Sequence, residues 1–136
     1  MRIQIEFFKN DLREAIGAGI YEIAVCKSGH RKALYIGESV TVLGRCAYHL
    51  YLLKSNPSYF GFTKSTINDP SIVLCFSLRE NTTNTQKRKK TEKKLISKEL
   101  PLSQSGISDR LKRPQERRAA LEEFLAIAAD KPIQSF

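Results

Sequence analysis

The sequence predicts an α/β fold, in which a central, mostly antiparallel three-stranded sheet is flanked by helices in a single small domain. Two observations predict this class. Runs rich in β-branched and aromatic residues alternate along the chain with segments whose apolar residues recur at helical spacing. The chain also has 136 residues, 41% of them hydrophobic, which is enough for one core. Since no internal repeat or linker interrupts the pattern, we assign residues 1–136 to one domain.

The first elements predicted are a short helix and a β-hairpin. Asp11 and Glu14 form a capping pair for a helix over residues 12–16. Residues 20–26 and 33–37 have the composition of strands, and a short polar link that contains glycine joins them. Because such a link favours adjacent antiparallel strands, these two runs predict a hairpin.

A longer helix is predicted directly after the hairpin, over residues 40–55. Ser39 is a favourable N-cap for it, and Pro57 follows its last turn. The apolar stripe predicted for this helix consists of Leu43, Ala47 and Leu50. We assign no element to residues 56–70. Three aromatic residues of that segment are suited to stacking on bases, but we expect them to pack within the protein: Tyr59, Phe60 and Phe62.

A third strand and two more helices complete the prediction. Residues 72–76 are apolar without alternation, which is typical of a strand covered on both faces. A helix is predicted over about residues 86–100, ending before Pro101, and a last helix over about residues 114–129, with Pro114 in its first turn. The apolar residues predicted for these two helices are Leu95, Ile96 and Leu100 in the first, and Leu121, Phe124, Leu125 and Ala128 in the second.

The chain is strongly basic, with 23 Lys and Arg against 14 Asp and Glu, a net charge of +9 and a pI of about 9.6. Basic residues are densest in the predicted helix over residues 86–100. Such a cluster is suited to a polyanion, because neutralising phosphates releases condensed counterions. We therefore expect nucleic-acid contacts from Lys87, Arg88, Lys89, Lys90, Lys93 and Lys94, the alternative being a solvated helix face.

We expect a cytoplasmic protein without a membrane partner. No apolar run approaches the roughly 18 residues that a membrane span requires, and the first residues lack the apolar stretch of a secretory signal. The odd number of cysteines, Cys26, Cys46 and Cys75, and their wide spacing predict reduced thiols in the core. No Cys/His spacing indicates a zinc site.

Five features that could take part in catalysis follow one another along these elements. Gly19-Ile20-Tyr21 opens the first predicted strand, and Tyr35-Ile36-Gly37 ends the second. Arg45 and His49, four residues apart, project from one side of the next helix, away from its predicted apolar stripe. Glu92 lies three and four residues before an apolar pair on a later helix, which places its carboxylate on the inward side.

Together these residue types supply what phosphodiester hydrolysis requires. The reaction needs a group that positions or deprotonates the nucleophile, positive charge at the transition state, and a divalent cation held by a carboxylate. A tyrosine or histidine can serve as the first group and Arg45 as the second. Glu92 is a plausible ligand for Mg²⁺ or Mn²⁺.

The two tripeptides, with Arg45, His49, Glu92 and the following Leu95, Ile96 and Pro101, resemble the GIY-YIG nuclease superfamily. The resemblance covers about residues 19–104. It implies a metal-dependent endonuclease that hydrolyses phosphodiester bonds of DNA, either duplex or branched, and a homodimer is one way for such an enzyme to cut both strands.

The resemblance also implies a role for each matching residue. Tyr21 would act as the general base for the attacking water or would position it, and Tyr35 would lie near the same phosphate. Arg45 would bind the scissile phosphate, and His49 would donate a hydrogen bond to it or relay a proton. Glu92 would hold Mg²⁺ or Mn²⁺. Because the usual pKa of tyrosine is about 10, nearby cations would have to favour the phenolate of Tyr21.

Two residues depart from the family pattern. Glu38 follows the second tripeptide, where many relatives have Lys or another polar residue, and it brings negative charge close to the phosphate site. Gln104 occupies the place of a terminal Asn, whose hydrogen bonds it can imitate.

Two alternatives to the nuclease hypothesis remain at this stage. The first is a nucleic-acid-binding protein that keeps the fold and the basic surface without turnover. The second is an interaction module in which Leu121, Phe124 and Leu125 of the last helix form a dimer interface.

Overall fold

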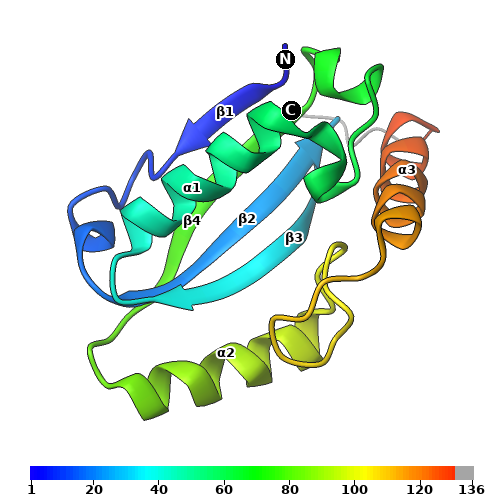
Figure 1. The fold of residues 1–136 in the computed structure, drawn as a ribbon. Helices are drawn as coiled ribbons and strands as arrows, with labels where there is room; N and C mark the ends of the chain where they lie inside the picture. The colour runs from blue at the N-terminus through cyan, green and yellow to red at the C-terminus, as the bar shows by residue number, and fades with distance from the viewer. Residues whose placement is uncertain (131–136) are drawn as a thin grey trace.

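The computed structural model describes residues 1–130, which form a four-stranded mixed sheet with three α-helices (Figure 1). The strands lie in the order β1-β4-β2-β3. Their bounds are Gln4–Phe7 for β1, Gly19–Lys27 for β2, His30–Ser39 for β3 and Val73–Asn81 for β4. β2 pairs antiparallel with both β3 and β4, whereas β1 pairs parallel with β4. The α/β class and the hairpin are therefore confirmed.

The prediction of three strands was wrong, because β1 adds a fourth strand at one edge. Its four residues are too few for their polar–apolar alternation to stand out in the sequence. The strand is held by pairing with β4, and the flanking Ile3 and Phe8 are buried. Tertiary pairing rather than a local pattern thus defines this element.

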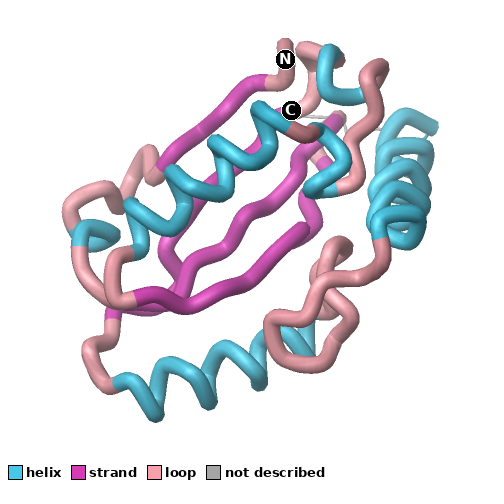
Figure 2. The backbone as a smooth tube through the Cα atoms, viewed as in Figure 1, coloured by secondary structure: helices cyan, strands magenta, loops and turns pink. Residues whose placement is uncertain are grey.

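The helices are α1 (Val42–Ser55), α2 (Thr85–Glu99) and α3 (Pro114–Asp130). Figure 2 shows α1 running over one face of the sheet and α2 running beside β3. The main apolar cluster lies on the α1 side of the sheet and includes Leu121 and Leu125 of α3. On the other face, Ile96 of α2 packs in a smaller cluster with Ile20 and Ile36.

Short 3₁₀ turns occupy the remaining positions: η1 at Glu14–Ile16, within the predicted short helix, then η2 at Pro57–Phe60 and η3 at Thr66–Asn68. The last two lie in the segment that had no assignment. Phe60 and Phe62 are fully buried there, so the expected packing is confirmed for these two rings. The alternative, that they stack on bases, was wrong for both.

The buried stripe of α1 differs from the predicted one. It consists of Val42, Cys46, His49 and Leu53, while Ala47 is exposed and Leu43 and Leu50 are only partly buried. The sequence pattern had counted His49 as polar, but hydrogen bonds to its ring allow this face to turn inward. The helix also begins later than predicted. Thr41 is its N-cap, and the Ser39 hydroxyl accepts a hydrogen bond from the Thr41 N–H at 3.0 Å.

On α2 the buried residues are Arg88, Glu92 and Ile96, and Leu100 is exposed, against its predicted place on the apolar side. On α3 the predicted stripe is confirmed, with Leu121, Leu125 and Ala128 buried and Phe124 packed against the core. Of the three residues named for a dimer interface, Leu121 and Leu125 are buried inside the monomer, and Phe124 is half-buried against its core.

Two further expectations concern the cysteines and the membrane. All three cysteines are free, but only Cys46 is buried, so the predicted place in the core was wrong for the half-buried Cys26 and Cys75. Within residues 1–130, no helix combines the length and the apolar character needed to span a bilayer.

Candidate active site

A pair of stacked tyrosines lies at the centre of the candidate site. Tyr21 of β2 is paired with Gly37 of β3, and its ring lies 6.1 Å from that of Tyr35 with 20° between the planes. A Cβ atom at Gly37 would approach Tyr21 Cζ to 2.5 Å and Tyr35 Cε1 to 2.8 Å. Glycine is thus required at this position because the Tyr21 phenol fills the space of a side chain, not because of its backbone angles.

His49 of α1 joins this pair from the neighbouring layer. Its Nε2 lies 2.7 Å from the Tyr21 hydroxyl and its Nδ1 lies 3.0 Å from the Tyr59 hydroxyl. Burial, together with the nearby charge of Arg45, lowers the pKa of His49 to about 4. The imidazole is therefore neutral near pH 7, so one ring nitrogen donates a hydrogen bond and the other accepts one.

Arg45 lies one turn before His49 and is exposed. Its guanidinium interacts electrostatically with the hydroxyls of Tyr21 and Tyr35. Burial raises the pKa of Tyr21 well above its usual range and that of Tyr35 to about 12, although the charge of Arg45 acts in the opposite direction. Both phenols are therefore protonated near pH 7, and the sequence-based requirement that cations favour a phenolate is not met in the metal-free protein.

These contacts assign the protons of the cluster. Because the Tyr21 phenol is protonated and the charge of Arg45 acts on its oxygen, we assign its O–H as the donor to His49 Nε2. The Nδ1–H of His49 then donates to the Tyr59 oxygen. We assign this tautomer from the hydrogen-bond pattern. The result is a chain of three side chains in which a neutral imidazole is ready to accept the proton of Tyr21.

Glu92 projects from α2 and is 7% exposed. Burial raises the pKa of its carboxyl to about 7, with further increases from the carboxylates of Asp109 and Glu38. A backbone hydrogen bond from Glu38 acts in the opposite direction. The charges of Asp109 and Glu92 also raise the pKa of Tyr35.

Glu92 offers one carboxylate to a divalent cation of the type implied by the sequence. No cluster of three or more His, Cys, Asp or Glu side chains suited to a metal is found in residues 1–130. Mg²⁺, however, commonly binds one or two carboxylates and completes its coordination with water and phosphate oxygens. The backbone of Glu38 and the charge of Lys89 offset only part of the effect of burial and acidic neighbours on Glu92, and a cation would favour the charged carboxylate further.

Glu38, the first departure from the family pattern, forms an ion pair with Arg88. Arg88 Nε donates to Glu38 Oε2 at 2.6 Å, and its NH1 group lies 3.4 Å from the carbonyls of Thr82 and Thr83. Because Arg88 is 2% exposed, it is withdrawn from the surface on which we expected it to contact nucleic acid. The remaining basic residues of that group are exposed: Lys87, Lys89, Lys90, Lys93 and Lys94.

Gln104, the second departure, holds the edge of β3. Its side-chain Nε2 donates to the Ile36 carbonyl at 2.8 Å, and its Oε1 accepts from the Ile36 N–H at 2.9 Å. Gln104 is 1% exposed, so this pair of hydrogen bonds satisfies an otherwise buried amide. It fixes the strand segment between Tyr35 and Gly37.

The structure thus brings Tyr21, Tyr35 and His49 into direct contact, with Arg45 one turn before His49 on α1, and the charges of Arg45 and Glu92 both act on Tyr35. Sequence reasoning missed two neighbours of this cluster, Tyr59 and Asp109. Tyr59 was treated only as a packing or stacking residue. Neither residue lies at a spacing that points to the site, because both come from irregular segments that the fold carries back to it.

Comparisons with protein-family models, with curated proteins and with solved structures found no match for this chain.

Proposed function

We propose that the protein is a metal-dependent endonuclease that hydrolyses phosphodiester bonds of DNA, with a site of the GIY-YIG type. The observation that carries the proposal is the 2.7 Å contact between Tyr21 and the neutral His49, next to an exposed arginine. A buried hydrogen-bonded phenol and imidazole are not needed for packing alone, since apolar side chains would fill this space without a desolvation cost.

The proposed mechanism uses Arg45 to bind and orient the scissile phosphate. Its guanidinium can make bidentate contacts with two phosphate oxygens and stabilise the charge that develops on them. The phosphate then lies next to the hydroxyls of Tyr21 and Tyr35, with which Arg45 interacts electrostatically. Tyr35 is placed to donate a hydrogen bond to the same phosphate.

His49 solves the problem posed by the raised pKa of Tyr21. As the Tyr21 oxygen takes a proton from the attacking water, the Tyr21 O–H proton moves to His49 Nε2, so the phenol never has to exist as a free phenolate. The Tyr59 hydroxyl accepts a hydrogen bond from Nδ1–H and keeps the imidazole in the receptive tautomer. Tyr21 and His49 therefore act as one base.

Glu92 is the residue that would hold Mg²⁺ or Mn²⁺. When bound, the cation supplies charge neutralisation for the phosphate and the departing oxygen. Since one such site addresses one strand, a break in both strands requires two copies of the chain or two successive events.

The test is cleavage of supercoiled and branched DNA by the wild type and by Tyr21→Phe and Glu92→Gln, each with Mg²⁺, with Mn²⁺ and with EDTA. We expect metal-dependent cutting by the wild type and a loss of at least about a hundredfold in each variant, because Tyr21→Phe removes the acid–base group and Glu92→Gln removes the carboxylate that would hold the cation. Glu122→Gln, an exposed residue of α3, is the matched control and should cut normally. DNA that is bound but uncut under every metal condition would instead support the binding protein without turnover.

A further inference from the structure

The outer face of α1 carries two tyrosines that the proposed reaction does not use. Tyr48 is 50% exposed and Tyr51 is 64% exposed, and they are the only aromatic residues among the exposed large apolar side chains of residues 1–130. Their rings are nearly parallel, with centroids 6.4 Å apart and 19° between the planes. Two large rings exposed to water next to each other do not gain the stabilisation that most aromatic residues obtain from burial.

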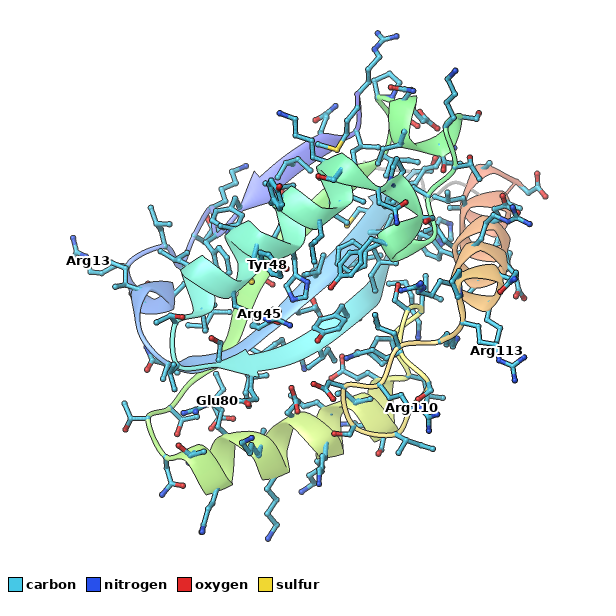
Figure 3. All side chains as sticks on the ribbon, viewed as in Figure 1. Arg13, Arg45, Tyr48, Glu80, Arg110 and Arg113 are labelled. Atoms are coloured by element: carbon cyan, nitrogen blue, oxygen red, sulfur yellow. The ribbon has the colours of Figure 1, made fainter. Side chains whose placement is uncertain are left out.

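This tyrosine pair is continuous with the candidate active site. The Arg45 guanidinium carbon lies 5.8 Å from the centroid of the Tyr48 ring, so the cation that serves the phosphate site also touches the first of the two rings. Figure 3 labels Arg45 and Tyr48 close to each other on α1. A ligand whose phosphate lies at Arg45 would therefore meet the tyrosine rings next.

The charge of α1 suits a polyanion. The helix Val42–Ser55 contains no Asp or Glu, and Lys54 lies in its last turn beyond Tyr51. Along the helix Arg45 therefore precedes the two exposed tyrosines, Tyr48 and Tyr51, and the exposed Lys54 follows them. Aromatic rings interleaved with basic groups are the usual composition of surfaces that bind single-stranded nucleic acids.

We propose that the α1 platform, defined as Arg45, Tyr48 and Tyr51, binds unpaired nucleotides adjacent to the scissile phosphate. The substrate class is then DNA with a single-stranded segment, such as a flap or a branch, rather than plain duplex. In a duplex the faces of the bases are covered by their neighbours, whereas an unpaired base can place its face on a tyrosine ring. This inference rests on the proposed nuclease function for the position of the phosphate, but binding to the platform is a separate property.

Binding is measured first, in EDTA, with a short oligo-deoxythymidine and with a blunt hairpin duplex of matched phosphate number. The variants are Tyr48→Ala/Tyr51→Ala, which removes both rings, and Tyr48→Phe/Tyr51→Phe, which keeps them. Ile127→Ala removes a comparably exposed apolar side chain from α3 and is the control. Since all these side chains lie at the surface, melting temperatures should agree with that of the wild type within a few degrees.

We expect the alanine pair to weaken binding of the single strand roughly tenfold or more, as stacking energies imply, with less than about a twofold change for the duplex. The phenylalanine pair and the control should bind both ligands as the wild type does. In Mg²⁺, the alanine pair should cut a flap substrate more slowly and leave the rate on plain duplex unchanged.

Equal losses for single strand and duplex in the alanine pair would overturn the proposal, because the tyrosines would then act on the phosphate backbone and not on bases. No loss for either ligand would also overturn it. Failure of the nuclease function has a different signature. In that case no substrate is cut in any metal, while tyrosine-dependent binding of the single strand is retained.

Discussion

Adding a single methyl group at Gly37 would disrupt the packing of Tyr21 against Tyr35. A Cβ atom there would contact the Tyr21 phenol, which is 1% exposed and cannot turn away. We expect Gly37→Ala to lower the free energy of unfolding by about 1–3 kcal/mol, the usual cost of overpacking a core. The measurement is denaturant unfolding monitored by circular dichroism.

Gly44→Ala on α1 is the matched control for this substitution. Its nearest neighbour would be Thr41 Oγ1 at 3.6 Å, an ordinary contact, and alanine favours a helix by about 0.5–1 kcal/mol over glycine. Gly44→Ala should therefore be as stable as the wild type or more so. If both alanine variants had the same free energy of unfolding, the inference that Tyr21 packs closely against Gly37 would be wrong.

The Glu92 carboxyl predicts an unusual dependence of stability on pH. In the unfolded chain it loses its proton near its ordinary pKa of 4.5, but in the fold burial holds that pKa at about 7. Between these values the folded state binds more protons, so ionisation of Glu92 costs stability progressively as the pH rises toward about 7. The cost is absent at lower pH and complete above about 7.

Glu92→Gln removes this cost. We expect the variant to match the wild type near pH 4.5 and to melt a few degrees higher near pH 8, measured in EDTA by thermal unfolding. Glu122→Gln, at an exposed position, should show no such divergence. A variant that is less stable than the wild type at high pH would mean that the ionised carboxylate is already compensated in the metal-free protein.

Among the elements, those with strong local patterns could be predicted and those defined by distant partners could not. The strands around Tyr21 and Tyr35, the helix that carries Arg45 and the stripe of α3 all follow from periodicity. β1 could not be predicted, because it is defined by its long-range pairing with β4 and not by a local sequence pattern.

For α1 and α2, the sequence did not predict which residues are buried, and the physical reason is the same in both helices. Each buries polar residues, His49 on α1 and Arg88 on α2, whose partners come from other elements. A pattern that counts only apolar residues therefore points to the wrong side of the helix. The candidate site itself was predictable as five residues, but its proton connections through Tyr59 were not, because they depend on a 3₁₀ turn without a sequence signal.

The attachment of α2 to β3 depends on the ion pair of Arg88 with Glu38. The pair lies one helical turn from Glu92, and Glu38 also supplies the backbone hydrogen bond to the Glu92 carboxylate. We expect Arg88→Met to cost about 2–4 kcal/mol in denaturant unfolding, because Glu38, 18% exposed, loses its partner. Lys90→Met, at an exposed position of the same helix, is the control and should have little effect.

The double variant Arg88→Met/Glu38→Gln separates the two causes of this loss. If the cost comes from an unpaired charge, the double variant should recover most of the stability. If Arg88 acts mainly by packing its stem and bonding to the Thr82 and Thr83 carbonyls, the second substitution should restore nothing.

On the scale of the whole molecule, the exposed lysines of α2 lie on a different element from the candidate site, and we assign them a different role in DNA binding. Arg45 and the tyrosines lie along α1 and β3, whereas Lys90, Lys93 and Lys94 are exposed on α2 and form no ion pair in the part of the chain that the structure describes. We infer that these lysines contribute long-range attraction to DNA, without selecting its structure.

Lys90→Gln/Lys93→Gln/Lys94→Gln should therefore weaken duplex and single-strand binding to a similar extent. If each lysine neutralises one phosphate, the slope of log affinity against log salt should become shallower by about 2 to 3, since each contact contributes about 0.9 for duplex DNA and about 0.7 for single strands. The slope is obtained by titrating labelled DNA at several salt concentrations in EDTA. The control removes the same charge near β1, at the opposite edge of the sheet, and in the loop before η3: Arg2→Gln/Lys9→Gln/Lys64→Gln, all at exposed positions. Equal slopes for the two triple variants would show that DNA responds to the net charge of +9 as a whole, and that α2 provides no defined contact surface.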